Sequence, residues 1–460
     1  MSLVDRSRLM TLLQQEHQLF TDSHPRSHEL FKRGAQNLLR GVPMCWMSEW
    51  EGGFPIFLAH AQGARLTDVD GITYDDFCLG DTGALAGHAP EATARAVEAR
   101  FRRGATAMLP TEDAAWVAAE LARRFGLPLW QFSLSATDAN RWTLRLAREL
   151  TGRHQILVFN GCYHGTVDEA VVALDNQGRA ISRPGNIGAA IDPTVTTQIV
   201  EFNDLAALER SLASREIACV LTEPVLTNAG GIIHPVDGFH AGLRELTERT
   251  GTYLVLDETQ TFPNGPGGFT AEHGLRPDFL TIGKAIAGGV PLGAYGMSQE
   301  VADLISERAI EMGDIGAVGG TLAGNALALA AARATLGQVL TTEAHQRMNA
   351  LGERFAYGVD GIIAHHQLPW HVVRLGSRIE FRYLPQPPRN AAEALQAVDE
   401  EVDAYLHLFL LNRGVLLTPF HNMALMSPAT DEGQVDRHTE VFAEAVGVLV
   451  STRPQHPATA

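Results

Sequence analysis

The chain has 460 residues, 45% of them hydrophobic, which is enough apolar material for a large core spread over two or more lobes. Its formal net charge of −17 is offset by no basic run, so nucleic acids and anionic membranes are excluded as expected partners. The four cysteines lack CxxC spacing and no apolar run has the length of a signal peptide or membrane span, so we expect a cytoplasmic protein with neither disulfides nor a metal site.

Residues 1–80 are predicted to form amphipathic helices and then a small sheet. Apolar residues recur at helical spacing between about Asp5 and Leu39. Strands are expected at residues 56–58 and within residues 64–77, where Asp70-Gly71 has the composition of a hairpin turn. We assign this segment to a small domain.

Residues 81–335 alternate between helices and short apolar strands, which is typical of a doubly wound α/β domain. Residues 174–200 are rich in Gly, Pro and Asn and are predicted to form a surface loop. Helices are expected at about 91–102, 113–125, 239–249 and 325–340, and strands from Trp130, at 155–159, from Ala218, at 253–257 and at 279–282.

Residues 336–460 are predicted to form an α+β lobe that completes the small domain. Strands are expected at residues 372–375, 379–383 and 415–417, and a helix at residues 431–450. The residues after Thr452 are expected to be disordered.

Lys32 and Lys284 are the only lysines in the chain. Lys32 lies in a polar run, whereas Lys284 follows the apolar residues 279–282, where a permanent cation is costly unless it is paired. An amine can lose its proton and form an imine with a carbonyl group, which a guanidinium cannot do. Taken alone, Lys284 could also end a strand with its amine in solvent.

Residues 253–257 form another apolar run, and it also ends in a charge, that of Asp257. Open α/β sheets bind ligands at the carboxyl ends of their strands, so Asp257 and Lys284 are expected at one site. Pyridoxal 5′-phosphate requires this pair, because a lysine binds its aldehyde and a carboxylate keeps its pyridine nitrogen protonated. We therefore predict this cofactor, with Lys284 and Asp257 as catalytic residues.

Ser135, Ala136 and Thr137 follow a predicted strand and open a helix. Small residues let the backbone approach an anion, and a helix start offers unpaired N–H groups. These residues are candidates for binding the cofactor's phosphate, although a serine here is also an ordinary helix cap.

Residues 254–296 resemble the class III aminotransferases, with Asp257-Glu258, Pro277-Asp278 and Gly283-Lys284 in register and residues 288–294 following. The similarity covers nearly the whole chain and is nearest to the glutamate-1-semialdehyde aminomutase-like branch, which has omega- and amine-transaminase relatives. It implies pyridoxal-phosphate fold type I: a large doubly wound domain with a mixed, mainly parallel sheet, and a smaller α+β domain built from both chain ends. It also implies a homodimer with shared active sites.

The resemblance implies roles for residues around the cofactor. Tyr163 is expected on the face of the pyridine ring, and His164 to shape the turn beside it. Thr259 replaces a family valine and could either hydrogen-bond the cofactor or fill the same space. Glu223, in the family's Glu-Pro segment, could support the cofactor or a neighbouring side chain.

Two further positions concern the phosphate. Thr321 resembles the residue that donates its hydroxyl to the phosphate of the other subunit, although the segment could instead be a plain helix cap. Ala136 replaces the glycine of the family pattern Ser-Gly-Thr-Glu-Ala, which could alter the approach of the backbone.

Both arginines that hold a substrate carboxylate in relatives look absent. One would fall within residues 41–50 and the other near residues 418–421, and neither segment contains an arginine. We therefore predict a pocket for an apolar or aromatic amine. Its expected walls are Trp46, Met47, Trp50 and Phe420, and Arg378, Arg382 and Arg413 are candidates for binding an acidic co-substrate.

The first hypothesis for function is an aminotransferase that moves an amino group between such an amine and a keto acid, aldehyde or ketone. Lys284 would move the proton as general acid and base. An aminomutase, a transaminase of β-amino or other amino acids, a racemase and a decarboxylase remain as alternatives, because Lys284 and Asp257 would serve all of them. A non-catalytic binding protein is a third hypothesis, against which the retention of Lys284 argues.

Overall fold

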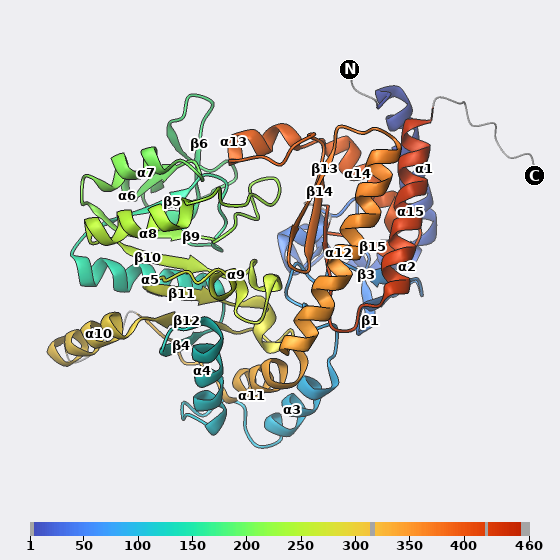
Figure 1. Cartoon of the computed structure of the whole chain (residues 1–460). Helices are drawn as coiled ribbons and strands as arrows, with labels where there is room; N and C mark the ends of the chain where they lie inside the picture. Colours follow the sequence, from blue (N-terminus) through green and yellow to red (C-terminus); the bar gives the residue numbers. More distant parts are fainter. Residues whose placement is uncertain (1–3, 313–317, 419–421, 452–460) are drawn as a thin grey trace, which may run out of the picture.

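The computed structural model describes residues 4–312, 318–418 and 422–451 (Figure 1). Its centre is a seven-stranded sheet in the order β4-β12-β11-β10-β9-β5-β8. β12 is antiparallel to both of its neighbours, and the other described pairs are parallel, which confirms the predicted mixed sheet. The strands are β4 (Leu129–Ser133), β5 (Gln155–Phe159), β8 (Thr197–Val200), β9 (Ile217–Thr222), β10 (Tyr253–Asp257), β11 (Phe279–Ile282) and β12 (Gly293–Met297).

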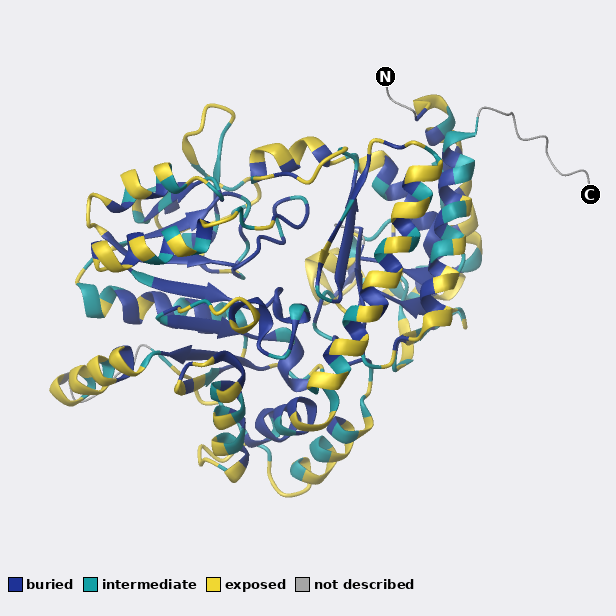
Figure 2. Cartoon of the chain, in the orientation of Figure 1, coloured by how far each residue is buried: buried dark blue, intermediate teal, exposed yellow. Residues whose placement is uncertain are grey.

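The central strands are continuous apolar runs because both faces of the sheet are covered. In β11, Phe279 packs into one apolar cluster while Leu280 and Ile282 pack into another. Figure 2 shows these strands as buried. The helices of this part are α3 (Glu91–Phe101), α4 (Glu112–Phe125), α5 (Ala136–Thr151), α7 (Leu205–Leu212), α8 (Phe239–Thr250), α9 (Gly268–Glu272), α10 (Gln299–Met312) and α11 (Ala326–Ala334).

A second, four-stranded sheet joins both ends of the chain. β3 (Thr73–Asp76) pairs with β2 (Arg65–Asp68) across the predicted Asp70-Gly71 hairpin, and β15 (Val415–Leu416) lies parallel to β3. β1 (Leu58–Gln62) completes this sheet, and β13 (His371–Leu375), β14 (Arg378–Arg382) and β16 (Met423–Leu425) form another. The domain boundaries at residues 80 and 335 stay a prediction.

Long helices cover these smaller sheets, on the right of Figure 1. α1 packs against α14, and α12 packs against α15. No helix in the described ranges is long and apolar enough to cross a bilayer. These helices are α1 (Arg6–Ser23), α2 (Pro25–Gly34), α12 (Thr342–His365), α14 (Glu400–Leu411) and α15 (Glu432–Val450). The short α13 (Ala391–Ala394) instead packs into the apolar cluster of the large sheet.

The prediction of a surface loop over residues 174–200 was wrong in part. The segment contains β7 (Ala180–Ser182), which pairs with β6 (Val172–Leu174), and α6 (Pro193–Thr196). It ends in β8, the edge strand of the central sheet. β8 is only four residues long, and its pairing with β5 is a tertiary contact that local composition does not report. The segment after Thr452, expected to be disordered, lies outside the described residues.

Leu280 provides a test of the sheet core, because it is fully buried in β11. Leu280→Ala is expected to lower the free energy of unfolding by about 2–5 kcal/mol, since it leaves a cavity between the sheet and its helices. Urea unfolding followed by circular dichroism measures this change. Leu395→Ala is the matched control, because Leu395 is 67% exposed, and equal losses in the two variants would contradict the described core.

Candidate active site

Residues predicted for the site follow five strands that end at one edge of the central sheet. The five strands run in the same direction, so the loops that follow them lie along one edge. Ser135 follows β4, Tyr163 follows β5, Glu223 follows β9, Asp257 ends β10 and Lys284 follows β11.

The amine of Lys284 is paired rather than left in water. Its Nζ lies 2.8 Å from Oδ2 of Asp81, and the lysine side chain is 27% exposed. The backbone of Lys284 has a φ of 48°, a left-handed conformation that costs a non-glycine residue about 1–3 kcal/mol. The preceding Gly283 leaves little room for a side chain, because a Cβ there would lie 3.0 Å from the Cβ of Ala136. Tight packing therefore holds Lys284 at this edge.

Asp81 was missed in the sequence, although it is the described acidic partner of Lys284. Its Oδ1 accepts a hydrogen bond of 3.3 Å from Nε2 of Gln260. The Oε1 atom of Gln260 in turn accepts from Oγ1 of Thr82 at 2.7 Å and from Nη1 of Arg378 at 2.8 Å. The only local indication was the Gly80–Gly83 turn, whose polar residues do not by themselves indicate a site.

Asp257 is buried and held by hydrogen bonds. Nδ2 of Asn140 donates to its Oδ2 at 2.7 Å, and the backbone N–H of Thr259 donates to its Oδ1 at 3.0 Å. Nδ1 of His164 also lies 3.0 Å from Oδ2 of Asp257. Oδ1 of Asn140 accepts from Oγ1 of Thr281 at 2.6 Å, so a side chain of β11 orients the amide. Asn140 was also missed in the sequence, since it looks like any polar residue of a helix.

These contacts set the charge of Asp257. Burial alone would raise its pKa, but His164, Thr259 and Asn140 lower the pKa below the ordinary value. Burial alone would lower the pKa of His164, but its neighbours Cys162 and Asp257 raise that pKa to about 10. Asp257 is thus a fixed anion inside the protein. The expectation that His164 only shapes the turn was incomplete, because its ring contacts this carboxylate.

Ser135, Ala136 and Thr137 form the start of α5, as the sequence predicted. Oγ of Ser135 accepts from the backbone N–H of Asp138 at 3.2 Å and caps the helix. A Cβ on Gly293 would lie 2.4 Å from the backbone of Ser135, so a glycine is required for this close packing. Ala136 lies in α5 and does not have a positive φ. The backbone conformation at this position therefore does not require the glycine of the family pattern.

The aromatic residues predicted for the pocket are only partly brought together. The rings of Trp46 and Tyr163 lie 5.7 Å apart between centroids, and Met47 lies in the same short helical turn as Trp46. Trp50 instead contacts His407 edge-on at 5.6 Å and joins the apolar cluster of the small sheet. Phe420 lies outside the described residues.

Glu223, Thr259 and Thr321 differ in their surroundings. Glu223 is buried; one of its carboxylate oxygens accepts from Oγ1 of Thr227, and the other has no described partner. Burial raises the pKa of Glu223 to about 7. The hydroxyl of Thr259 is likewise buried without a described partner, whereas Thr321 is exposed.

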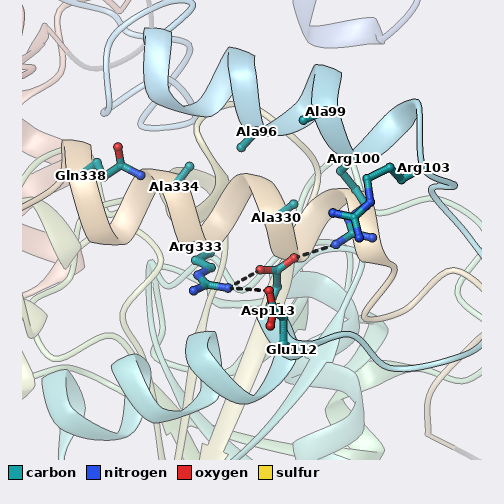
Figure 3. A pocket seen from close by; sticks show the side chains of 10 residues that line it. All are labelled: Ala96, Ala99, Arg100, Arg103, Glu112, Asp113, Ala330, Arg333, Ala334 and Gln338. Atoms are coloured by element: carbon teal, nitrogen blue, oxygen red, sulfur yellow. Dashed lines mark hydrogen bonds and ion pairs between the residues drawn. The ribbon is translucent and has the colours of Figure 1, made fainter.

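A separate hollow of about 250 Å³ lies between α3, α4 and α11 (Figure 3). Two of its three arginines, Arg333 and Arg100, are paired, since they contact Asp113 at 2.8 and 3.4 Å. None of the predicted site residues in the described part of the chain lines this hollow.

The residues present fit pyridoxal 5′-phosphate. The start of α5 offers unpaired N–H groups for a phosphate, Asp257 offers a buried anion for a pyridinium, and Lys284 offers an amine for an aldehyde. The unpaired hydroxyl of Thr259, directly after Asp257, is a further donor that a bound ring could use.

Residues 46–446 match the family described as Aminotransferase class-III. A glutamate-1-semialdehyde 2,1-aminomutase from Anaeromyxobacter sp. (strain Fw109-5) is 35% identical over 406 residues, which cover 86% of this chain and 93% of the relative. The chain belongs to the class III aminotransferases. It is therefore an enzyme of pyridoxal-phosphate fold type I, as the resemblance implied, and pyridoxal phosphate is its cofactor.

Solved structures agree with this family. A glutamate-1-semialdehyde aminomutase from Pseudomonas aeruginosa PAO1 has a TM-score of 0.94 at 48% identity, covering 97% of this chain and 99% of that one. A second structure of the Pseudomonas aeruginosa aminomutase, a lysine-to-alanine variant, was solved in complex with PMP. An omega-transaminase from Sphaerobacter thermophilus has a TM-score of 0.84 at 27% identity, covering 92% of this chain and 98% of that one.

The contacts of His164 with Cys162 and Asp257 predict a pH dependence of stability. The pKa of His164 is about 10 in the folded chain and about 6.5 when unfolded. Its contribution to stability is therefore full below about pH 6.5 and is lost as pH rises through 10. Urea unfolding between pH 7 and 10 is expected to show a smaller fall in the free energy of unfolding for His164→Gln than for the wild type.

His438→Gln is the control for this measurement. His438 is also buried, but burial lowers its pKa to about 3, so it is neutral across the tested range. Its replacement should leave the pH slope unchanged. A slope in His164→Gln equal to that of the wild type would contradict a His164 that is protonated in the folded chain at neutral pH.

Proposed function

We propose that the chain is an aminomutase, which exchanges an amino and an oxo group within one small substrate. The observation that carries this proposal is the similarity to proteins named glutamate-1-semialdehyde aminomutase, at 35% and 48% identity over nearly the whole chain. Structures named as an omega-transaminase and a β-phenylalanine aminotransferase share only 27% identity with it. The alternative in our sequence hypotheses is thus better supported than the transaminase of apolar amines.

When bound, the cofactor supplies an aldehyde that takes up the amino group and a ring that withdraws electrons from the reacting carbon. Lys284 binds the aldehyde through its Nζ. The same amine then acts as general acid and base and moves the proton of the reacting substrate carbon. Asp257 keeps the pyridine nitrogen protonated, which its lowered pKa and its buried position support. Both residues are fixed by contacts that exist without any ligand.

The remaining predicted residues bind the cofactor. We assign the phosphate to Ser135, Ala136 and Thr137, and the two faces of the ring to Tyr163 and Thr259. The unpaired donors at the start of α5 and the orphaned hydroxyl of Thr259 support this assignment. The carboxyl group of Glu223 is buried, and one of its oxygens has no described partner. We therefore place Glu223 behind the cofactor and not among the groups that react.

We also propose a homodimer in the cytoplasm. Thr321 is exposed in the single chain, which leaves it accessible to the phosphate site of a second copy. The exposed side chains of Phe101, Met108 and Leu109 offer apolar surface that a partner could cover. All four cysteines are free, which suits a reducing compartment.

An amine transaminase is the second candidate. The contact between Trp46 and Tyr163 places an aromatic wall near the site, and residues 41–50 contain no arginine for a carboxylate. This observation favours an apolar substrate without bearing on whether the amino group stays within one molecule.

The need for an acceptor separates the two candidates. Holoenzyme is incubated with glutamate-1-semialdehyde and with a neutral 2-amino aldehyde, each with and without pyruvate, and the products are separated by chromatography. An aminomutase is expected to convert one of these substrates without pyruvate, because donor and acceptor carbons are in one molecule. If turnover of these amino aldehydes strictly requires pyruvate, the proposal is overturned. Lys284→Ala is the inactive control.

A further inference from the structure

Asn140 is a fully buried side chain of α5 that connects several elements around the site. Its Nδ2 donates to Oδ2 of Asp257 at 2.7 Å and to the backbone carbonyl of His164 at 3.2 Å. Its Oδ1 accepts from Oγ1 of Thr281 at 2.6 Å. One uncharged amide thus joins the end of β10, the loop after β5 and the strand β11.

The orientation of this amide is fixed from both sides. Its nitrogen carries only donors and its oxygen only acceptors, so a half-turn of the amide would reverse both. The half-turn would bring the oxygen against two other acceptors, the carboxylate of Asp257 and the carbonyl of His164. The hydroxyl of Thr281 favours the observed orientation, because it donates to the oxygen. Thr281 is itself fully buried, and it is the register partner of Asp257 in the adjacent strand.

A polar side chain at position 140 is unfavourable for the helix alone. Asn is a weaker helix former than Ala or Leu, and burying an amide is costly unless its groups are hydrogen-bonded. Ala139, Leu144 and Ala147 are buried apolar residues of the same helix. The contact with Asp257 therefore gives the reason for an amide among these residues.

The two oxygens of Asp257 differ in the number of donors around them. Oδ2 accepts from Asn140 and lies 3.0 Å from Nδ1 of His164, which uses both of its acceptor positions. Among the described residues, Oδ1 accepts only from the backbone N–H of Thr259, at 3.0 Å. One acceptor position therefore remains, and it is on Oδ1. Because Asp257 is buried, a donor at this position has to come from the protein or from a ligand.

The ring nitrogen of the family's cofactor matches this position. When protonated, it carries a single N–H, which is the donor that Oδ1 lacks. Asn140 occupies the other oxygen and so prevents Oδ2 from taking the place of Oδ1. It does not contact the ring in this arrangement, and it acts on the ring only through Asp257.

We propose that Asn140 is a positioning residue that holds Asp257 with Oδ1 toward the ring nitrogen, and that Thr281 keeps the amide of Asn140 in the required orientation. This inference rests on the role proposed above for Asp257. It goes beyond that role, because it names the oxygen that faces the ring and the two residues that select it. It does not depend on whether the amino group stays within one molecule.

Two ligands that differ only at the ring nitrogen test this proposal. Pyridoxamine 5′-phosphate binds without a covalent bond to Lys284, and its 1-deaza analogue has a carbon in place of the ring nitrogen. Both affinities are measured by isothermal titration calorimetry on the whole chain freed of its cofactor. The wild type is expected to prefer pyridoxamine 5′-phosphate by about tenfold or more, the scale of one hydrogen bond to a charged group.

The ratio of the two affinities is the readout, because a general loss of packing weakens both ligands alike. Asn140→Leu removes the amide at similar size and should lower the ratio by about tenfold. Thr281→Val removes only a hydroxyl and should lower the ratio by about threefold, whereas Thr281→Ser should retain it. In the double variant Thr281→Val should add no further loss, since Thr281 acts through Asn140.

Thr247→Val is the matched control for the change at Thr281. Thr247 is also fully buried, and its hydroxyl donates to the backbone carbonyl of Arg244 within α8 at 2.9 Å. This variant should leave the ratio unchanged. A second readout is ¹⁵N NMR of holoenzyme loaded with ring-labelled cofactor. The ring nitrogen is expected to be protonated at neutral pH in the wild type and to shift toward the unprotonated form in Asn140→Leu.

An unchanged ratio in Asn140→Leu, in protein that melts cooperatively, would overturn the proposal. A further loss from Thr281→Val in the Asn140→Leu background would also overturn it. If Asn140→Leu does not fold, Thr281→Val decides alone, and an unchanged ratio there has the same meaning.

Asp257→Asn separates this result from a failure of the role proposed for Asp257. It should abolish the preference for pyridoxamine 5′-phosphate. If the preference persists in Asp257→Asn, the role of Asp257 is refuted and the proposal for Asn140 fails with it. A loss in Asp257→Asn without any loss in Asn140→Leu refutes the proposal for Asn140 alone.

Discussion

The ion pair between Lys284 and Asp81 links the reactive amine to the rest of the molecule. It lies where β11 ends, so its position depends on a strand that is buried on both faces. From Asp81 the contacts continue through Gln260 to Arg378 on β14, in the smaller part of the chain. The amine of Lys284 is therefore connected through side-chain contacts both to the central sheet and to β14.

The carboxylates of Asp257 and Asp81 lie at the same edge of the sheet but in different surroundings. Asp257 is desolvated and anionic because neighbouring groups hydrogen-bond it, which suits a permanent partner for a charged ring nitrogen. Asp81 is 42% exposed and pairs with the amine of Lys284. Charged groups interact more strongly in the less polar interior than at the surface, which strengthens the contacts of the buried Asp257.

The features predictable from sequence were those carried by a few consecutive residues. The apolar strands ending in Asp257 and Lys284, and the helix start at Ser135, each follow from local pattern. Asp81 and Asn140 could not be found in this way, because they meet their partners across 203 and 117 residues of chain. The same reason explains the missed edge strand β8 and the position of Trp50 against His407, both of which are decided by tertiary packing.

The most direct test of the account is to locate the cofactor's covalent attachment. Holoenzyme is reduced with sodium borohydride, digested and examined by peptide mass spectrometry. The account predicts one phosphopyridoxyl group per chain on the peptide that contains Lys284, and none on the peptide that contains Lys32 or in Lys284→Ala. Attachment at Lys32, or an unmodified Lys284 in protein that retains the cofactor, would contradict it.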